Sequence, residues 1–155
     1  MDPLLRTLLI TAATFTALLC GASLDQSIKQ LPARHQIGLT AFSSYAKAAD
    51  LRNGVIWYAI LGIGAALATI AVAVVVWAFH ANEPYAAATY MASVFAVGHT
   101  VCTTQAAPTY HRQKKVEAEE DLQKLFDKFE RIQTVRSIFI VLNFAAILWA
   151  IAICL

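Results

Sequence analysis

Charged residues are scarce in this sequence. Asp, Glu, Lys and Arg make up 14% of the 155 residues, whereas about 25% is usual for soluble globular domains. Hydrophobic residues account for 59%, and the mean hydropathy is +0.59. This composition excludes an ordinary soluble domain and favours a single membrane domain over residues 1–155.

Cysteine is also sparse, and its few positions exclude two classes of protein. Cys20, Cys102 and Cys154 are odd in number and widely spaced, and no C-x-x-C motif occurs, so neither a disulfide framework nor membrane thiol-disulfide exchange of the usual kind is expected. His99 and Cys102 have helical ligand spacing, but Cys102 points away from the polar side of the helical wheel. We therefore predict no metal site, and no cofactor motif is evident.

The sequence has no strong excess of either charge. The net charge is only +2, and the most charged stretch, 112–136, mixes six acids with seven bases, so a nucleic-acid role has no support. There is no internal repeat either, which makes a transporter or channel a less attractive interpretation and one that would require oligomerisation.

Four long apolar runs account for the hydrophobic excess. They cover about residues 4–24, 55–79, 85–107 and 134–155. Crossing a hydrocarbon core of about 30 Å takes roughly 20 helical residues, so each run is long enough to do so. The sequence therefore predicts an all-α, integral, multi-pass membrane four-helix bundle in contact with the lipid bilayer. The first run is longer than a typical signal-peptide core, and we expect it to be a span.

The basic residues predict the orientation of this bundle. With four spans, the connections 1–2 and 3–4 share one side of the membrane, and eleven of the twelve Lys and Arg residues lie there. Arg6 is the one exception. The positive-inside rule then places both connections in the cytoplasm and both termini on the non-cytoplasmic side.

The two cytoplasmic connections are expected to be helical and to extend the bundle beyond the bilayer. Residues 33–50 have the pattern of an amphipathic helix. Residues 112–133 are charged, but they carry an apolar stripe that needs cover, which the extended first helix and 33–50 can supply. The stripe consists of Leu122, Leu125, Phe126, Phe129 and Ile132.

Breaks in the helices are predicted from proline and glycine. The first helix is expected to run until Pro32, and Pro108 is expected to end or kink the third. Asn53-Gly54 is a plausible break before the second span. One helix can then run from about Arg112 to the C-terminus.

Polar side chains inside the third run mark the place where a site is expected, because such groups are costly in a bilayer unless they face protein, a cavity or each other. On a helical wheel the hydroxyl residues share one sector, with His99 at its edge. They are Thr89, Ser93, Thr100, Thr103 and Thr104. These hydroxyls either bond to backbone groups or line a polar pocket, and both alternatives stay open. Asp25 likewise either pairs with Lys29 at the interface or stands at the mouth of a polar cavity.

A short set of motifs resembles a known family. The sequence resembles the anthrone-oxygenase-like family of four-helix membrane proteins in three places. They are Thr100, the run Pro108-Thr109-Tyr110, and the segment 125–136 with Phe129, Gln133 and Arg136. In that family the third helix ends in Pro-[Thr/Ile]-Asn, and the fourth opens with Trp-x-x-x-[Asn/His]-x-x-Arg. In this sequence Tyr110 replaces Asn, Phe129 replaces Trp, and Gln133 replaces Asn or His.

The resemblance implies a small oxygenase that acts without an evident cofactor on an apolar small molecule such as an anthrone. Such a reaction needs a base and a group that stabilises an enolate oxygen. The candidate catalytic residues are His99, His111 and Arg136. The candidate substrate-binding residues are Asp25, Ser93, Thr100, Thr103, Thr104, Tyr110 and Gln133.

A non-enzymatic interpretation suits the sequence equally well. The second run is rich in Gly and Ala, which lets helices approach closely. The chain can therefore also be a homo-oligomer, an accessory subunit or scaffold of a larger membrane complex, or a lipid-binding protein.

Overall fold

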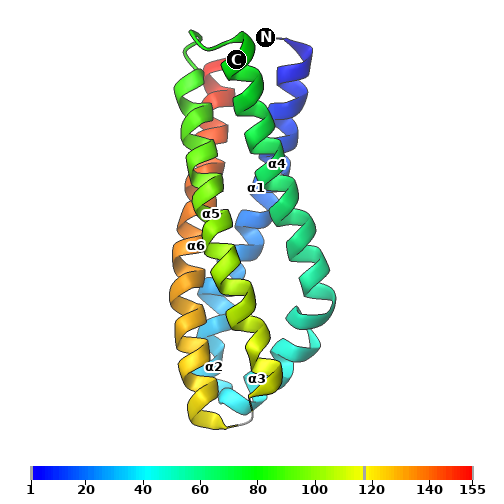
Figure 1. Ribbon diagram of the computed structural model, residues 1–155, viewed down its shortest axis with the longest axis vertical. Helices are drawn as coiled ribbons and strands as arrows, with labels where there is room; N and C mark the ends of the chain where they lie inside the picture. The colour runs from blue at the N-terminus through cyan, green and yellow to red at the C-terminus, as the bar shows by residue number, and fades with distance from the viewer. Residues whose placement is uncertain (1, 117, 155) are drawn as a thin grey trace.

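Four long helices form the body of the protein. The computed structural model describes residues 2–116 and 118–154 (Figure 1). The long helices are α1 (Pro3–Asp25), α4 (Val55–Phe79), α5 (Ala86–Arg112) and α6 (Glu119–Cys154). Two short helices, α2 (Leu31–Ile37) and α3 (Leu39–Ala48), connect α1 to α4. The described residues contain no strand, so the all-α prediction is confirmed for them.

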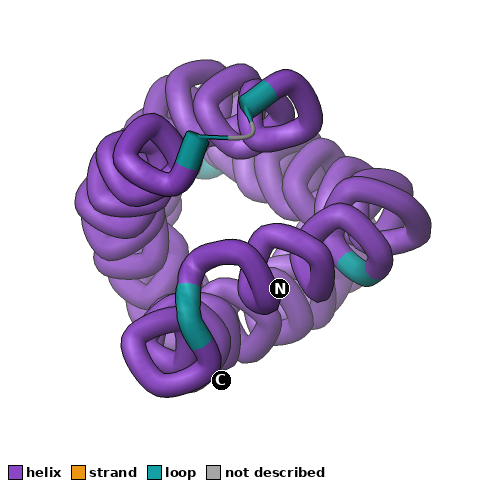
Figure 2. The backbone as a smooth tube through the Cα atoms, turned by 90° about the horizontal axis from the view of Figure 1, so that it is seen from below, coloured by secondary structure: helices purple, strands orange, loops and turns teal. Residues whose placement is uncertain are grey.

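The long helices pack as an antiparallel ring. Both α1 and α5 contact α4 and α6, and the view along the bundle shows the four helices arranged around a central axis (Figure 2). The two ends of the described chain lie together at one end of the bundle, while α2 and α3 lie at the other (Figure 1). The bundle therefore has a terminal end and an α2–α3 end.

Within residues 2–116 and 118–154, three helical segments are long and apolar enough to cross a membrane. They are Pro3–Ile37, Asp50–Phe79 and Glu119–Cys154. The helix α5 is not among them, because its Ser, Thr and His residues lower its hydropathy. Many large apolar side chains lie on the outside of the bundle, for example Leu67 and Trp77, with exposed fractions of 65% and 72%. These features are compatible with a membrane protein in contact with lipid.

The prediction that the first helix ends at Pro32 is wrong. A π-helical turn, Gln26–Gln30, continues α1 directly into α2. In this turn Leu31 donates its backbone N–H to Gln26, five residues back, so the helix is already wider where Pro32 lacks its own N–H. The helix ends instead at Gly38, whose φ of 85° favours glycine.

The other two predicted breaks have different outcomes. The helix α5 continues through Pro108 to Arg112. Pro108 lies on the exposed side of the helix, so the backbone carbonyl that loses its N–H donor because of the proline is not buried in the core. A 3₁₀ turn, Gln113–Lys115, follows, and α6 begins at Glu119 rather than near residue 112. The α-helix of the second span, α4, begins at Val55, directly after the predicted break at Asn53-Gly54, but the π-helical turn Asp50–Gly54 continues into it without a gap.

Apolar side chains fill both ends of the bundle. At the terminal end, Leu5 and Leu9 of α1 pack with Val72, Val76 and Ile147. At the α2–α3 end, the predicted stripe of α6 is covered as expected. Its members Leu122, Phe126 and Phe129 cluster with residues of α2, α3 and α5, namely Leu31, Phe42, Ala46, Ala106 and Tyr110.

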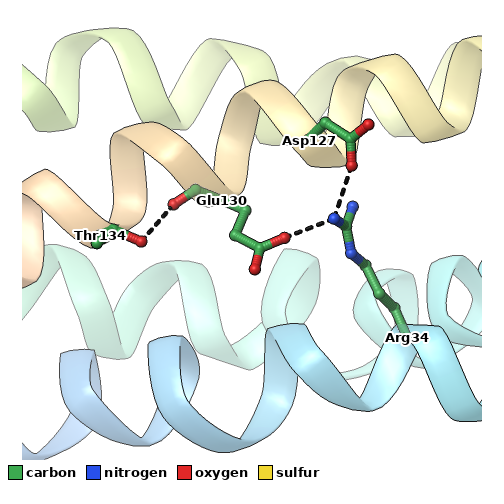
Figure 3. Close-up of polar contacts among 4 residues, drawn as sticks. All are labelled: Arg34, Asp127, Glu130 and Thr134. Carbon is green, nitrogen blue, oxygen red and sulfur yellow. Dashed lines mark hydrogen bonds and ion pairs between the residues drawn. The ribbon is translucent and has the colours of Figure 1, made fainter.

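A buried arginine fastens α2 to α6. The Arg34 side chain is 4% exposed, and its Nη2 lies 2.7 Å from the Asp127 carboxylate and 2.5 Å from that of Glu130 (Figure 3). Asp127 and Glu130 are one turn apart on α6, so one guanidinium bridges both. This arrangement holds the short connecting helix against the long one.

A polar layer, formed by Ser23, Ser27, Gln133 and Ser137, joins α1 and the π turn after it to α6 nearer the middle of the bundle. The hydroxyls of Ser23 and Ser27 lie 2.9 Å and 2.7 Å from that of Ser137. Gln133 Nε2 donates to the Ser23 carbonyl and hydroxyl at 3.3 Å and 3.1 Å. Interhelical hydrogen bonds of this kind stabilise helix pairs in apolar surroundings.

Replacing Arg34 with methionine should lower stability clearly, by roughly 2 kcal/mol, because charge-assisted hydrogen bonds to two carboxylates are lost. Lys29→Met is the matched control, since it removes the exposed pair with Asp25 on the same helical segment. Thermal unfolding in detergent measures both variants. Equal melting temperatures for the two would contradict the role given to Arg34.

Two glycines mark close approaches between helices. A Cβ at Gly64 would lie 2.5 Å from the Phe15 ring, and one at Gly98 would lie 2.7 Å from the Phe139 ring, whereas one at Gly62 would meet no atom within 4 Å. Gly64→Val and Gly98→Val should therefore each cost about 1–3 kcal/mol relative to Gly62→Val. All three changes alter helix propensity alike, so the difference in melting temperature isolates the contact. Indistinguishable melting temperatures would refute it.

Candidate functional site

A cavity of about 190 Å³ lies among the four long helices in the half of the bundle nearer α2 and α3. It is mostly apolar, with polar groups contributed by every wall. The lining residues of α1 and the two π turns are Leu19, Gln26, Asp50 and Leu51; those of α4 are Val55, Tyr58, Ala59 and Gly62; those of α5 are His99, Thr103, Ala107, Tyr110 and His111; those of α6 are Phe129 and Arg136. An apolar cavity with a few converging polar groups is the usual form of a small-molecule site.

One face of α5 supplies the longest wall. His99, Thr103, Ala107 and Tyr110 follow each other at steps of four, four and three residues, which keeps them on one side of the helix. The His99 side chain is 5% exposed, and its Nε2 has no hydrogen-bond partner within the described chain. A buried imidazole nitrogen without a partner is costly, and here it belongs to a residue that lines a cavity.

Arg136 lines the same cavity from α6. Its Nη2 donates to Gln26 Oε1 at 3.3 Å, while its Nε is buried without a partner among the described residues. Arg34, Lys29 and Lys124 form ion pairs with carboxylates, but Arg136 forms none in residues 2–116 and 118–154. A half-buried guanidinium that lacks a carboxylate partner carries a desolvation cost, which an anionic ligand would offset.

The cavity is bounded toward the α2–α3 end by a tyrosine and an aspartate. The Tyr110 hydroxyl donates to Asp50 Oδ2 at 2.6 Å, and its ring stacks on Phe129 with centroids 4.2 Å apart. Burial and the adjacent Asp50 carboxylate both raise the pKa of Tyr110, so its hydroxyl stays protonated and remains a donor. The pair therefore closes this end of the cavity with a fixed polar contact.

Five of the ten predicted site residues line the cavity. They are His99, Thr103, Tyr110, His111 and Arg136. Four others lie outside it, and their polar groups bond elsewhere. Ser93, Thr100 and Thr104 donate to backbone carbonyls of their own helix, and Asp25 pairs with Lys29 at 2.5 Å. The fifth residue outside the cavity is Gln133, which belongs to the polar layer between α1 and α6 and donates to Ser23.

Three polar lining residues were not predicted as part of a site. Gln26 follows directly on Asp25, but it faces the cavity where Asp25 does not. Tyr58 reads from sequence as an interfacial aromatic, and Asp50 as one charge of a surface helix. The available signal was spacing: Asp50 and Tyr58 are eight residues apart, which places them near one face across a continuous helical segment.

The described residues offer no group of three His, Cys, Asp or Glu side chains that could hold a metal ion together. Comparison of the chain with protein-family models, curated proteins and solved structures finds no match. The function is therefore inferred from the geometry of the cavity and from the resemblance described above.

Proposed function

We propose that this chain is an anthrone-oxygenase-like oxidoreductase, a cofactor-independent monooxygenase that acts on an apolar aromatic molecule inside a four-span membrane bundle. One observation carries the proposal: the unpartnered Nε2 of His99 and the unpaired guanidinium of Arg136 belong to the lining of a single apolar cavity in the described part of the chain. A base and a cation on one cavity suit a substrate that becomes an oxyanion.

Treating α5 as the fourth span is consistent with its place in the ring. It lies between α4 and α6, both of which belong to segments that are long and apolar enough to cross a membrane. The stretch 85–107 contains no charged residue, although its Thr and His residues lower its hydropathy. In this arrangement the α2–α3 end faces the cytoplasm, and both termini lie on the other side.

Arg136 is the group that would hold the substrate oxygen. Deprotonation of an anthrone gives an enolate whose negative charge resides largely on oxygen. Because Arg136 has no carboxylate partner in the described chain, its charge is available to that oxygen, and the surrounding apolar walls strengthen the attraction. Tyr110 and Phe129 line the cavity and would supply aromatic contacts to a flat ring system.

His99 is the candidate base. Its buried Nε2 takes a proton from the ring methylene carbon, whereas His111, the other candidate, is exposed. The enolate passes an electron to O₂ and recombines with the resulting superoxide, which forms the C–O bond. The proton returns to the peroxide oxygen, the remaining C–H and the O–O bond break, and water leaves. One oxygen atom of O₂ enters the quinone and the other enters water, so no external reductant is needed.

Oxidation of anthrone to anthraquinone by the purified protein in detergent or vesicles tests this function. Arg136→Gln should lower kcat/KM by about 10²–10³, the cost of losing an oxyanion donor. His99→Ala should lower it by about 10²–10⁴, the usual contribution of a general base. The exposed residues Arg52 and His35 supply the controls, and Arg52→Gln and His35→Ala should keep wild-type turnover.

Two results would count against the assignment. Turnover that survives in both cavity variants would remove these residues from the reaction. Binding of a fused-ring anion without any turnover by the wild-type protein would instead favour the non-enzymatic interpretation, a lipid-binding or accessory membrane bundle.

A further inference from the structure

The first turns of α4 are uncovered by the rest of the bundle. Five of the six residues from 55 to 60 are exposed, and Tyr58 is the one that is half-buried. Farther along α4 the usual pattern of a packed helix returns, with Leu61, Ala65, Thr69, Val72 and Val76 buried at steps of three or four. An exposed helix start means that no neighbour closes either side of α4 at this level.

This uncovered stretch borders the cavity. Val55 and Ala59 of α4 and Ala107 of α5 line the cavity and are themselves exposed. At the same level the ribbons of α4 and α5 diverge toward the α2–α3 end (Figure 1). The next lining residue, Gly62, has room for a Cβ with no atom within 4 Å, so small side chains leave this passage open.

The surface around this passage is apolar. Ile56, Ile60 and Ile63 of α4 are exposed by 65%, 54% and 60%. All three belong to a helical segment that is long and apolar enough to cross a membrane. In a bilayer these side chains contact lipid rather than water, so the passage between α4 and α5 opens toward lipid at the edge of the hydrocarbon region.

We infer that the cavity is loaded sideways from the bilayer, between α4 and α5, by apolar weak acids dissolved in the membrane. This inference rests on the proposed function, because it takes the cavity lined by Arg136 as the binding site and specifies the chemical class of the ligands that bind there. The ligand enters with its apolar body among Val55, Ala59 and Ala107, and its oxyanion reaches Arg136. Charge complementarity selects the acid, and partition into lipid supplies the ligand at high local concentration.

The opposite route would pass through the polar end of the cavity. There Tyr110 and Asp50 are joined by a 2.6 Å hydrogen bond, and His111 is exposed beside them. A ligand from water would have to break this contact or pass His111. The two routes therefore differ in which α5 residue a larger side chain would obstruct: Ala107 for the bilayer, His111 for water.

Binding kinetics of anthracene-9-carboxylate to the full chain in phosphatidylcholine vesicles test the route. This probe is a fluorescent fused-ring anion that cannot undergo the proposed oxidation. Ala107→Phe and Ala59→Phe should each slow association by about tenfold, because the larger side chain lies on the entry route between α4 and α5. The matched control is Val101→Phe, an exposed α5 position that does not line the cavity and should bind as wild type does.

Arg136→Gln has the opposite signature, a higher Kd caused mainly by faster dissociation, and shows that the probe occupies the proposed site. Unchanged rates in Ala107→Phe and Ala59→Phe, or slower rates in His111→Phe, would overturn bilayer entry. Wild-type protein that does not bind the probe overturns both the route and the proposed function, whereas probe binding without anthrone turnover overturns only the oxygenase reaction.

Discussion

The positive charge of Arg136 is the feature on which the organisation of the cavity depends. Charged groups inside a helical membrane bundle are costly unless they are paired or reach water. Arg34, which is buried, binds two carboxylates and fastens two helices together. Arg136 has only the amide oxygen of Gln26 as a partner within residues 2–116 and 118–154. The two carboxylates account for the position of Arg34, whereas no carboxylate accounts for that of Arg136. We therefore propose that Arg136 binds a ligand.

The same half of the bundle combines a closed end with an open side. The end is closed by Tyr110, which bonds to Asp50 and stacks on Phe129. The side between α4 and α5 is lined by small residues, of which Ala59 and Ala107 are exposed. The resemblance to anthrone oxygenases places Asn and Trp where Tyr110 and Phe129 stand. In this chain the replacements form a stacked aromatic pair, so they supply a wall of the cavity rather than disrupting it.

Much of the fold follows from the sequence because apolar runs report directly on which segments are buried or face lipid. The run 55–79 coincides with α4, and the apolar stripe of α6 is covered by the segments expected to cover it. Proline was misleading at Pro32 and Pro108. Its local rule assumes a regular α-helix, whereas a π turn precedes Pro32, and Pro108 sits on an exposed side where its missing hydrogen bond is tolerated. Such compensation depends on the surrounding structure, which a local pattern does not contain.

The site was predictable only in part, for a related reason. A helical wheel puts the hydroxyls of α5 in one sector, but it cannot tell which of them face a neighbour: Thr89 is buried, whereas Thr100 and Thr104 are exposed. Of these hydroxyls only that of Thr103 belongs to a cavity-lining residue, and it bonds to the His99 carbonyl. Asp50 and Tyr58 join His99 and Arg136 only because the ring of helices brings α4 beside α5. That arrangement depends on tertiary packing, and no motif in the sequence encodes it.

The central claim is that Arg136 binds an oxyanion inside the cavity, and the guanidinium itself can report this. With ¹⁵N-labelled arginine in the full chain, the Nε–H resonance of Arg136, assigned by its loss in Arg136→Lys, can be followed during titration with anthracene-9-carboxylate and with neutral anthracene. A hydrogen-bonded anion should shift this resonance in a saturable way, whereas the neutral ring should leave it nearly unchanged. Equal responses to the two compounds, or no response to the anion, would contradict the assignment.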